Sequence, residues 1–208
     1  MSVSAGDVTD PGGAVALTPD FGPPWLKPLV DNLGRVPDAF RRRLPADVVA
    51  LITAADARAR LTKSGRDAAV LVLFSGPDSA DPATAPPPGA DLLVTVRADT
   101  LRHHAGQAAF PGGATDPGDT GPVDTALREA HEETGVDTAR LHPLATLERL
   151  FIAPSGFHVV PVLAYSPDPG PVSVVDAAET AIVSRVPLRA FINPENRLMV
   201  YRDYGSRR

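Results

Sequence analysis

The sequence has no cysteine and only one tryptophan among its 208 residues. Without cysteine the chain cannot form disulfides or thiolate metal sites, so any metal site must use oxygen or nitrogen ligands. No segment approaches the ~20 consecutive apolar residues that span a membrane. The first seven residues lack the basic region and the apolar core of a signal peptide. These absences together predict a cytoplasmic protein with no membrane-spanning segment.

An excess of positive charge is also missing, because the formal net charge is −5. Such a chain is a poor general binder of nucleic acid, since that binding rests largely on contacts between phosphates and lysine or arginine. A small polyanion remains a suitable partner, because a bound metal ion and a few local arginines decide the field at a site. The sequence therefore favours a small-molecule partner over nucleic acid or a membrane. It leaves the oligomeric state open, a homodimer included.

The composition predicts one domain preceded by a short tail. With 208 residues, of which 43% are hydrophobic, the chain is long enough for one proper core. Residues 1–24 are rich in glycine, aspartate and proline and are expected to be poorly ordered. Residues 25–208 then form the domain, with an N-terminal helical extension and a proline-rich loop at 77–89. Trp25 is expected on the core or on a partner chain rather than on a substrate.

The hydrophobic pattern mixes strands with a few helices. Expected strands cover residues 67–74, 91–97, 144–152, 156–165 and 198–201, with helices at 45–57 and from about residue 188. We expect the first two strands to pair as a hairpin, and the third and fourth to be joined by a tight turn. The pattern predicts a mixed α/β layered fold.

The segment Arg-Glu-Ala-His-Glu-Glu-Thr-Gly at residues 128–135 predicts the end of a helix. Thr120 is expected to cap this helix, Pro122 suits its first turn, and Gly135 ends it. A proline near the start and a glycine just past the end are typical helix boundaries. The helix therefore carries Glu132 and Glu133 in its last turn.

Three glutamates of this helix, Glu129, Glu132 and Glu133, crowd onto neighbouring positions. Like charges at such spacings cost roughly 0.2–0.5 kcal/mol per pair, and the helix dipole disfavours negative charge in the last turn. Arg128 relieves only part of the repulsion. The arrangement indicates either a solvated charged face or a site for a hard divalent cation, Mg²⁺ or Mn²⁺, which prefers oxygen ligands.

The surrounding residues favour the cation site, because together they resemble the Nudix box, G-x5-E-x7-R-E-U-x-E-E-x-G-U with U aliphatic. The matching residues are, in order, Gly113, Arg128, Glu129, Ala130, Glu132, Glu133, Gly135 and Val136. Asp119 stands where the pattern has glutamate, and one extra residue separates it from Arg128. The extra residue falls before the helix and leaves the spacing of the helical acids unchanged.

A run upstream of the box resembles the signature of the coenzyme A pyrophosphatase branch of this family, L-L-T-x-R-[SA]-x3-R-x3-G-x3-F-P-G-G. The matching residues are Leu93, Thr95, Arg97, Ala98, Arg102, Gly106, Phe110, Pro111, Gly112 and Gly113, and only Val94 departs. The resemblance spans about residues 65–190. It implies a Nudix α/β/α sandwich with the box helix packed on a mixed sheet. It also implies metal-dependent hydrolysis of coenzyme A to 4′-phosphopantetheine and 3′,5′-ADP.

The resemblance further implies roles for the residues of the box. Glu129 and Glu133 are expected to ligate Mg²⁺ or Mn²⁺, with Glu132 assisting and the carbonyl of Gly112 completing the shell. Arg128 is expected to hold one of these carboxylates in position. The sequence does not choose between the two cations.

A second set of residues is assigned to the substrate and to the attacking water. Arg97 and Arg102 carry planar guanidinium groups suited to phosphate oxygens, and His103 adds a donor. For Arg97 the alternative is a salt bridge at the strand end, and for Gln107 packing is as good an interpretation as substrate contact. Glu179 is the candidate acid of a late loop, either as base or as ligand, with solvation as its alternative.

Three functions follow, the first being hydrolysis of coenzyme A or its derivatives. The second is a Nudix pyrophosphatase for another nucleoside diphosphate, such as ADP-ribose or a dinucleotide. The third is a non-catalytic Nudix module that binds a nucleotide and regulates a partner. The third is disfavoured because such modules usually lose the acids of the box, which this chain keeps.

Overall fold

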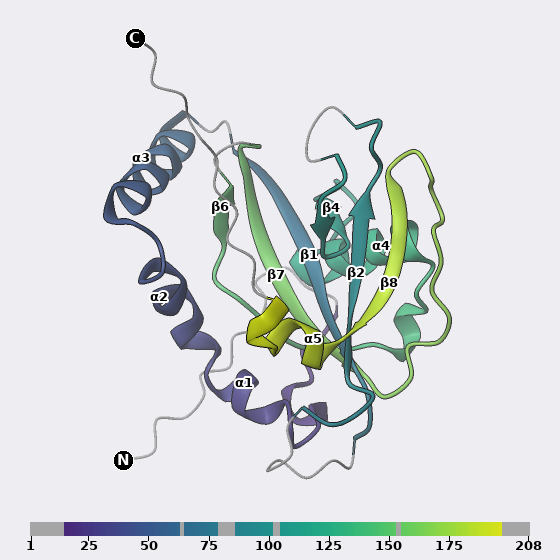
Figure 1. The fold of residues 1–208 in the computed structure, drawn as a ribbon. Coiled ribbons are helices and arrows are strands. Elements are labelled where there is room, and N and C mark those ends of the chain that lie inside the picture. Colours follow the sequence, from purple (N-terminus) through teal and green to yellow (C-terminus); the bar gives the residue numbers. More distant parts are fainter. Residues whose placement is uncertain (1–14, 63–64, 79–85, 102–104, 153–154, 197–208) are drawn as a thin grey trace.

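The computed structural model describes residues 15–62, 65–78, 86–101, 105–152 and 155–196. Its centre is an eight-stranded mixed sheet with the order β3-β2-β1-β7-β5, in which β4 pairs with β1, β6 with β7 and β8 with β2 (Figure 1). The strands are β1 (Arg66–Ser75), β2 (Asp91–Arg97), β3 (Ala108–Ala109), β4 (Gly112–Ala114), β5 (His142–Thr146), β6 (Leu150–Ile152), β7 (Phe157–Ser166) and β8 (Thr180–Pro187). The α-helices are α1 (Lys27–Asp31), α2 (Val36–Arg41), α3 (Ala46–Thr62), α4 (Pro122–Thr134) and α5 (Leu188–Ile192).

Alternation along the central strands gives each face of the sheet its own hydrophobic layer, because successive side chains of a strand point to opposite faces. One layer contains Ala69, Leu71 and Leu73 of β1, Val162 and Ala164 of β7, and Val123, Ala126 and Ala130 of α4. The other contains Phe74 of β1, Leu92 of β2, Leu163 and Tyr165 of β7, and Trp25 and Leu26. The protein is therefore an α/β fold with the box helix packed on a mixed sheet, as the sequence predicts.

Strands β1 and β7 form the middle of the sheet and run parallel from the pair Arg66–Phe157 to the pair Ser75–Ser166. Their sequences are long apolar runs, which is typical of strands covered on both faces. On its other edge β1 pairs antiparallel with β4 near Ala69 and Gly113. This pairing fixes the glycine-rich segment directly beside the central strand.

The segment before Trp25 belongs to the domain from residue 15 onward. Val15 and Leu17 pack against the layer under α4. The N–H and the hydroxyl of Thr18 both donate to the carbonyl of Pro143, over 2.7 and 3.1 Å. The expected division at residue 24 therefore differs from the structure, because two apolar residues anchor an otherwise polar segment. Residues 1–14 lie outside the described part of the chain.

Trp25 lies on the core, one of the two places expected for it. It is 5% exposed and meets Phe74 and Tyr165 edge-on, with ring centroids 6.4 and 6.2 Å away. Its indole nitrogen donates to the carbonyl of Pro77 over 2.8 Å. The N-terminal extension is thereby fixed to the second hydrophobic layer before it continues into α1.

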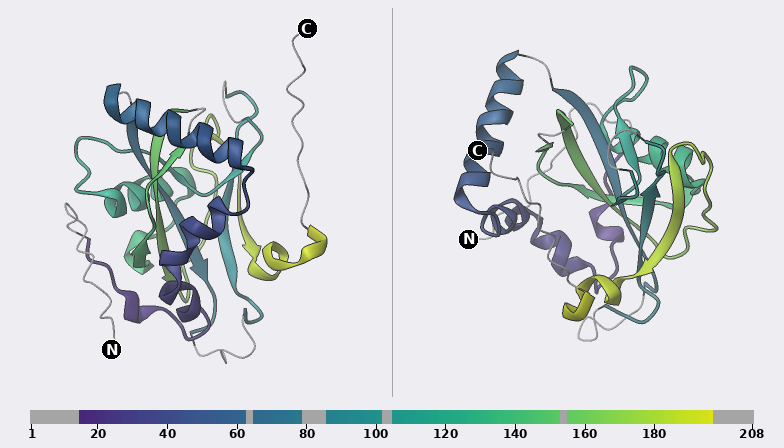
Figure 2. Two further views of the ribbon diagram at one scale, coloured as in Figure 1. Left: turned by 90° about the vertical axis from the view of Figure 1, so that its left-hand side faces the viewer. Right: turned by 45° about the horizontal axis from the view of Figure 1, so that its top comes forward.

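Helix α3 lies beside β6, at the edge of the sheet away from β8 (Figures 1 and 2). It begins at Ala46, one residue later than predicted, and continues to Thr62 rather than ending at residue 57. Ala59 is its only buried residue. Asp56 pairs with the buried ring of His158 on β7, 2.9 Å from its Nε2. Among the described residues no helix is long and apolar enough to cross a membrane.

Two expectations about the strands need correction. The run at 144–152 contains two short strands, β5 and β6, and each pairs antiparallel with β7. The hairpin of β1 and β2 is confirmed, but these strands pair only beside Ser75 and Asp91, since β4 occupies the same edge of β1 further along. The expected strand at 198–201 and most of the proline-rich loop lie outside the described residues.

Candidate active site

Helix α4 carries the acids of the box and has the predicted ends. Pro122 occupies its first turn, and Gly135 closes it with a φ of 66°, a conformation that favours glycine. Thr120 does not cap it as expected, because Gly121 occupies the capping position without a side-chain bond. Instead the hydroxyl and the N–H of Thr120 donate to the Asp124 carboxylate over 3.2 and 3.0 Å. The acid thus reaches back from the first turn, as in one half of a capping box.

Glu133 is the most buried of the three glutamates of the box, with 7% exposure. Its Oε2 atom is buried and has no hydrogen-bond partner among the described residues. Burial raises the pKa of this carboxyl to about 7, and the charge of Glu129 adds to the effect, while a backbone hydrogen bond from Gly112 and the charge of Arg97 oppose it. An orphaned, desolvated carboxylate oxygen is costly unless a proton or a cation satisfies it.

Glu129 lies one turn earlier and rests on the glycine-rich strand. A side chain at Gly113 would place its Cβ 2.5 Å from the Glu129 carboxylate, so the glycine leaves room for this acid. At Gly112 a Cβ would collide with the backbone of Ala69 and Val70. The absence of side chains therefore lets β4 pass between the central strand and the acids. Burial raises the pKa of Glu129, an effect that Arg128 partly offsets.

Arg128 joins the loop before the helix to the acids on it. Its Nε and Nη2 donate to the two oxygens of Asp119, each over 2.9 Å, and Nη2 also donates to the carbonyl of Ala114 over 3.0 Å. Its Nη1 donates to Glu129 over 3.1 Å and to Glu132 over 3.0 Å. A guanidinium fixed by a two-pronged contact is well suited to hold other carboxylates at set positions.

Asp119 is the residue of this network for which sequence reasoning predicted no role. Its side chain is 4% exposed and accepts from Arg128 and from the Thr125 hydroxyl, the latter over 2.9 Å. Arg128 therefore holds the pKa of Asp119 well below its usual range. Asp119 stood out only as a departure from the box. Its shorter side chain still reaches Arg128, with the extra residue accommodated in the preceding loop.

A cavity of about 750 Å³ opens beside the acids. Glu129, Glu132 and Glu133 line one end of it, together with Arg97 and Glu179. The volume lies in the range of small-molecule sites, which are typically ~300–1,000 Å³. The fold thus brings residues from α4, the end of β2 and the loop before β8 to one concave surface.

Arg97 and Glu179 reach this end of the cavity from the end of β2 and from the loop before β8. The Nε of Arg97 is buried without a hydrogen-bond partner, and no ion pair joins Arg97 to an acid among the described residues. The structure thus offers no support for a strand-end salt bridge. The backbone carbonyl of Glu179 accepts from the N–H of Ala98 over 2.8 Å. The charge of Glu179 contributes to the raised pKa of Glu129 and Glu133, which places it near both.

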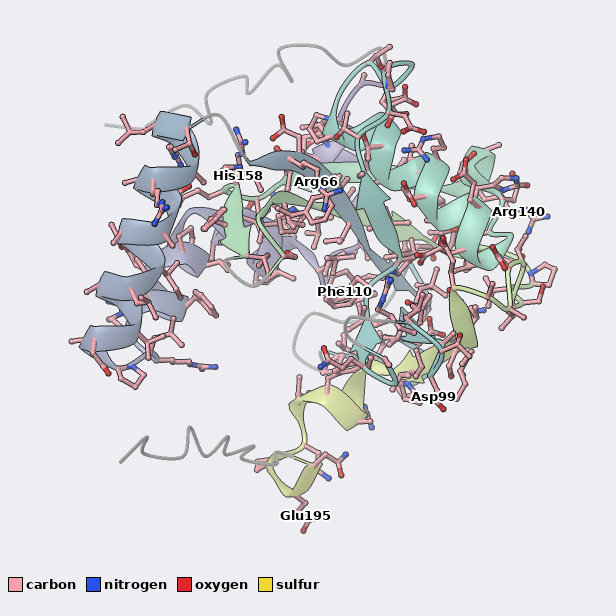
Figure 3. All side chains as sticks on the ribbon, turned by 90° about the horizontal axis from the view of Figure 1, so that it is seen from above. Arg66, Asp99, Phe110, Arg140, His158 and Glu195 are labelled. Carbon is pink, nitrogen blue, oxygen red and sulfur yellow. The ribbon has the colours of Figure 1, made fainter. Side chains whose placement is uncertain are left out.

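Of the remaining predicted substrate residues, the structure describes only Gln107. Gln107 lines the cavity, and its carbonyl accepts from the N–H of Arg97 over 3.0 Å. Phe110 packs against the second hydrophobic layer and also lines the cavity (Figure 3). Arg102 and His103 lie outside the described residues. Both interpretations of Gln107, packing and substrate contact, therefore stay open.

The acids of α4 suit a divalent cation because of their desolvated oxygen atoms, although they do not form a complete set of metal ligands by themselves. Among the described residues no three histidines, aspartates or glutamates are grouped closely enough to hold a metal ion by themselves. Glu133 nevertheless presents a buried oxygen without a partner, and Glu129 lines the same cavity. Glu132 is 56% exposed and turned toward Arg128. Two desolvated carboxylates of this kind suit a hard cation that completes its shell with substrate oxygens and water.

The sequence profile of the NUDIX domain matches residues 65–201. The chain belongs to the Nudix family. The matched region includes all eight strands of the sheet and helix α4.

Similar proteins match over shorter stretches. A protein of Yersinia enterocolitica is 48% identical over 81 residues, which are 39% of this chain and 41% of that protein. One of Yersinia pestis is 49% identical over 80 residues, 38% of this chain and 40% of that protein. Both carry the name uncharacterized Nudix hydrolase NudL. The matched stretch thus spans about two fifths of the length of these curated relatives.

Two solved structures are similar to parts of this chain. The Nudix hydrolase RenU of M. smegmatis is 25% identical, with a TM-score of 0.47 over 60% of this chain and 72% of that one. The C. elegans Ap4A hydrolase, solved as a binary complex, is 22% identical, with a TM-score of 0.46 over 61% of this chain and 83% of that one.

Proposed function

We propose that this protein hydrolyses the diphosphate bond of coenzyme A or a derivative, giving 4′-phosphopantetheine and 3′,5′-ADP. The reaction depends on Mg²⁺ or Mn²⁺. The observation that carries the hydrolytic part is the buried, unpartnered Oε2 of Glu133 beside Glu129 on the wall of a large cavity. The restriction to coenzyme A rests on the upstream signature, which includes Arg97 and Arg102.

The acids of α4 have distinct tasks in this proposal. Glu129 and Glu133 hold the cation, Glu132 assists, and the carbonyl of Gly112 completes the protein's share of the shell. When bound, the cation supplies charge neutralisation on the diphosphate and lowers the pKa of water. Arg128 keeps Glu129 and Glu132 in position through the bonds described above. Glu179, in the loop before β8, acts as the base that accepts a proton from the attacking water.

The substrate is held by the cationic side of the cavity. Arg97 projects a guanidinium whose Nε lacks a protein partner, so a phosphate oxygen can satisfy it. Arg102, His103 and Gln107 complete the group of donors that the signature assigns to the substrate. Hydrolysis of a diphosphate requires mainly alignment of water and stabilisation of charge on the equatorial oxygens. The acids of α4 and the guanidinium of Arg97 line the same cavity and together meet both needs.

A second candidate is hydrolysis of another nucleoside diphosphate derivative, such as ADP-ribose or a dinucleotide. The acidic wall and Arg97 suit any of these substrates, because each presents the same diphosphate group. The two candidates therefore differ only in what occupies the rest of the cavity.

A substrate panel separates these candidates. The full chain is incubated with Mg²⁺ or Mn²⁺ and with coenzyme A, dephospho-coenzyme A, ADP-ribose or a diadenosine polyphosphate, and kcat/KM is measured for each. We expect the highest kcat/KM for coenzyme A or an acyl derivative, with products whose masses equal 4′-phosphopantetheine and 3′,5′-ADP. A preference for ADP-ribose or the dinucleotide contradicts the coenzyme A assignment and leaves the general one.

A further inference from the structure

The cavity has a second end, formed where β1 and β7 begin. Arg66 and Phe157 are neighbours in the parallel pairing of these strands. The guanidinium carbon of Arg66 lies 4.1 Å above the centre of the Phe157 ring. At this distance a guanidinium stacked on an aromatic face is held both by dispersion and by attraction between the cation and the ring. The two side chains form a flat, positively charged surface, here called the Arg66–Phe157 platform.

The platform faces the same cavity as the acids of α4. Alternation along the strands places Arg66, Ala68 and Val70 on one face of β1, and Phe157 and Val159 on the same face of β7. All five line the cavity. The intervening residue His158 turns the opposite way toward α3, and in Figure 3 Arg66 lies between His158 and α4. The cavity is therefore acidic at one end and basic and aromatic at the other.

The charge of Arg66 is not neutralised within the described residues. No ion pair joins Arg66 to an acidic side chain there, although two aspartates lie nearby. One of them, Asp67, pairs with Arg149 over 2.5 Å. The other, Asp116, approaches Arg128 at 3.8 Å. The side chain of Arg66 is exposed, so its outer face is open to a ligand.

The distance between the two ends suits a substrate that reaches both. Gly113 on β4, which contacts Glu129, pairs with Ala69 on β1, and Phe157 starts the strand on the other side of β1. Neighbouring strands lie ~4.8 Å apart and residues along a strand ~3.3 Å apart, so these backbones are roughly 10–15 Å from each other. A diphosphate bond at the acids therefore leaves the nucleoside of the substrate within reach of the platform.

We propose that the Arg66–Phe157 platform binds the nucleotide half of the substrate, stacking its purine base on the guanidinium and attracting the phosphate on its ribose. This assignment rests on the proposed function and extends it to the specificity of the same cavity. A planar cation on an aromatic ring favours a flat π-system and an anionic group. The pantetheine arm is neither planar nor anionic, so it lies away from the platform.

Equilibrium binding of the two product halves tests the platform without turnover. The affinities of 3′,5′-ADP, AMP and 4′-phosphopantetheine are measured by calorimetry for the wild-type protein and for Arg66→Gln, Arg66→Lys and Phe157→Leu. Loss of a stacked base typically weakens binding about tenfold or more. We expect Arg66→Gln and Phe157→Leu to weaken the binding of 3′,5′-ADP by at least about tenfold. The affinity for 4′-phosphopantetheine should stay within about twofold of the wild-type value. Arg66→Lys retains part of the preference for 3′,5′-ADP over AMP, because it keeps the charge but loses the plane.

Arg149→Gln is the matched control, because Arg149 is also exposed but pairs with Asp67, which faces away from Phe157 along the strand. It should bind both halves like the wild type. Thermal unfolding of each variant checks that the fold is retained. Unchanged 3′,5′-ADP affinity in folded Arg66→Gln, or a loss confined to 4′-phosphopantetheine, overturns the platform. The proposed function and the platform can fail separately. If the wild-type protein does not hydrolyse coenzyme A, but the Arg66→Gln variant binds 3′,5′-ADP more weakly than the wild type does, the proposed function is overturned and the platform is supported.

Discussion

Helices α3 and α4 are the two longest of the described structure, with 17 and 13 residues, and they are built in opposite ways. The shorter α4 buries six residues and lies across the sheet. The longer α3 buries only Ala59 and lies beside β6 (Figure 2). Length is thus a poor guide to how firmly a helix is held, because packing of an apolar face supplies most helical stability in proteins.

The same two helices treat charge differently. In α4 the carboxylates of Glu129 and Glu133 are brought out of water against each other, and packing of its apolar face offsets the cost. In α3 the buried contact is a polar one, in which Asp56 joins His158 on β7 and Arg60 on its own helix. In α4, carboxylates that repel each other are held together at the candidate active site. In α3, a favourable pair between Asp56 and His158 attaches the helix to the sheet.

The largest effect is expected from Glu133→Gln, which keeps the volume of the side chain and removes a proposed ligand charge. Turnover of coenzyme A should fall by about three orders of magnitude or more, since the cation loses one of its two buried carboxylates. The measurement is kcat with saturating Mg²⁺ or Mn²⁺. Glu195→Gln, a change of an exposed glutamate in the turn after α5 (Figure 3), is the control and should leave kcat unchanged. Near wild-type turnover in Glu133→Gln would contradict the ligand assignment.

The same variant has a pH-dependent effect on the free energy of unfolding in metal-free buffer. Because the folded pKa of Glu133 is raised from 4.5 to about 7, the wild type loses stability as pH rises from 4.5 to about 7. The glutamine variant does not titrate. It should match the wild type below pH 4.5 and exceed it by at most about 3 kcal/mol above pH 7. Urea unfolding at pH 5 and pH 8 checks this, and an equal difference at both values would exclude the pKa shift as its cause.

The next largest effect is expected from Asp119→Ala, which leaves Arg128 without its two-pronged partner. Stability should fall by about 2–3 kcal/mol, as is typical when one member of a buried charged pair is removed. Since the folded pKa of Asp119 is depressed below 3.8, this contribution is present above pH 3.8 and is lost as pH falls below it. Turnover should fall too, because Arg128 no longer holds Glu129. Asp20→Ala, a change of an exposed aspartate in the 3-10 turn near the start of the described chain, is the control for stability.

A smaller change is expected from Gly113→Ala, which tests the close contact of β4 with α4. The added methyl group would meet the carboxylate of Glu129, whose flexible end can move aside. Stability should therefore change by less than about 1 kcal/mol, while kcat falls about ten- to hundredfold because a proposed ligand is displaced. Gly34→Ala, where no atom lies within 4 Å of the new methyl, is the control. Retained kcat would show that the exact position of Glu129 is unimportant.

The smallest effect on turnover is expected from Asp56→Ala in α3. Removing the partner of His158 should destabilise the attachment of α3 by about 1–2 kcal/mol and raise amide hydrogen exchange in α3 alone. Hydrogen exchange of the α4 amides and the turnover number should not change, because the Asp56–His158 pair joins α3 to β7 and does not involve α4. Equal acceleration of exchange in both helices would show that α3 and α4 unfold as one unit and would remove the contrast between them.

The sequence predicted α4 well because its ends and its charges are local features. Pro122 and Gly135 mark helix ends through backbone conformation, and the spacing of Glu129 and Glu133 follows from helical geometry alone. The strands β1, β2 and β7 were predicted for a similar reason, since buried strands are continuous apolar runs. All of these signals reside within a few consecutive residues.

What the sequence missed depends on contacts between distant residues. The pairing of Asp119 with Arg128 was hidden because the aspartate was seen only as a departure from a motif. The Arg66–Phe157 platform joins residues 91 positions apart and exists only because β1 and β7 are parallel neighbours. The attachment at Thr18 depends on the carbonyl of Pro143, which no local pattern indicates. Composition alone therefore assigned residues 15–24 to a disordered tail.

The most direct test of the account is the affinity for Mn²⁺ itself, measured by electron paramagnetic resonance at pH 8 in the absence of substrate. We expect the wild-type protein to bind Mn²⁺, Glu133→Gln to weaken this binding by about a hundredfold, and Glu148→Gln to leave it unchanged. Glu148 is an exposed glutamate that pairs with Arg41 away from the cavity, so it controls for general loss of negative charge. Equal Mn²⁺ affinity in all three proteins would contradict the claim that the buried carboxylate of α4 holds the catalytic cation.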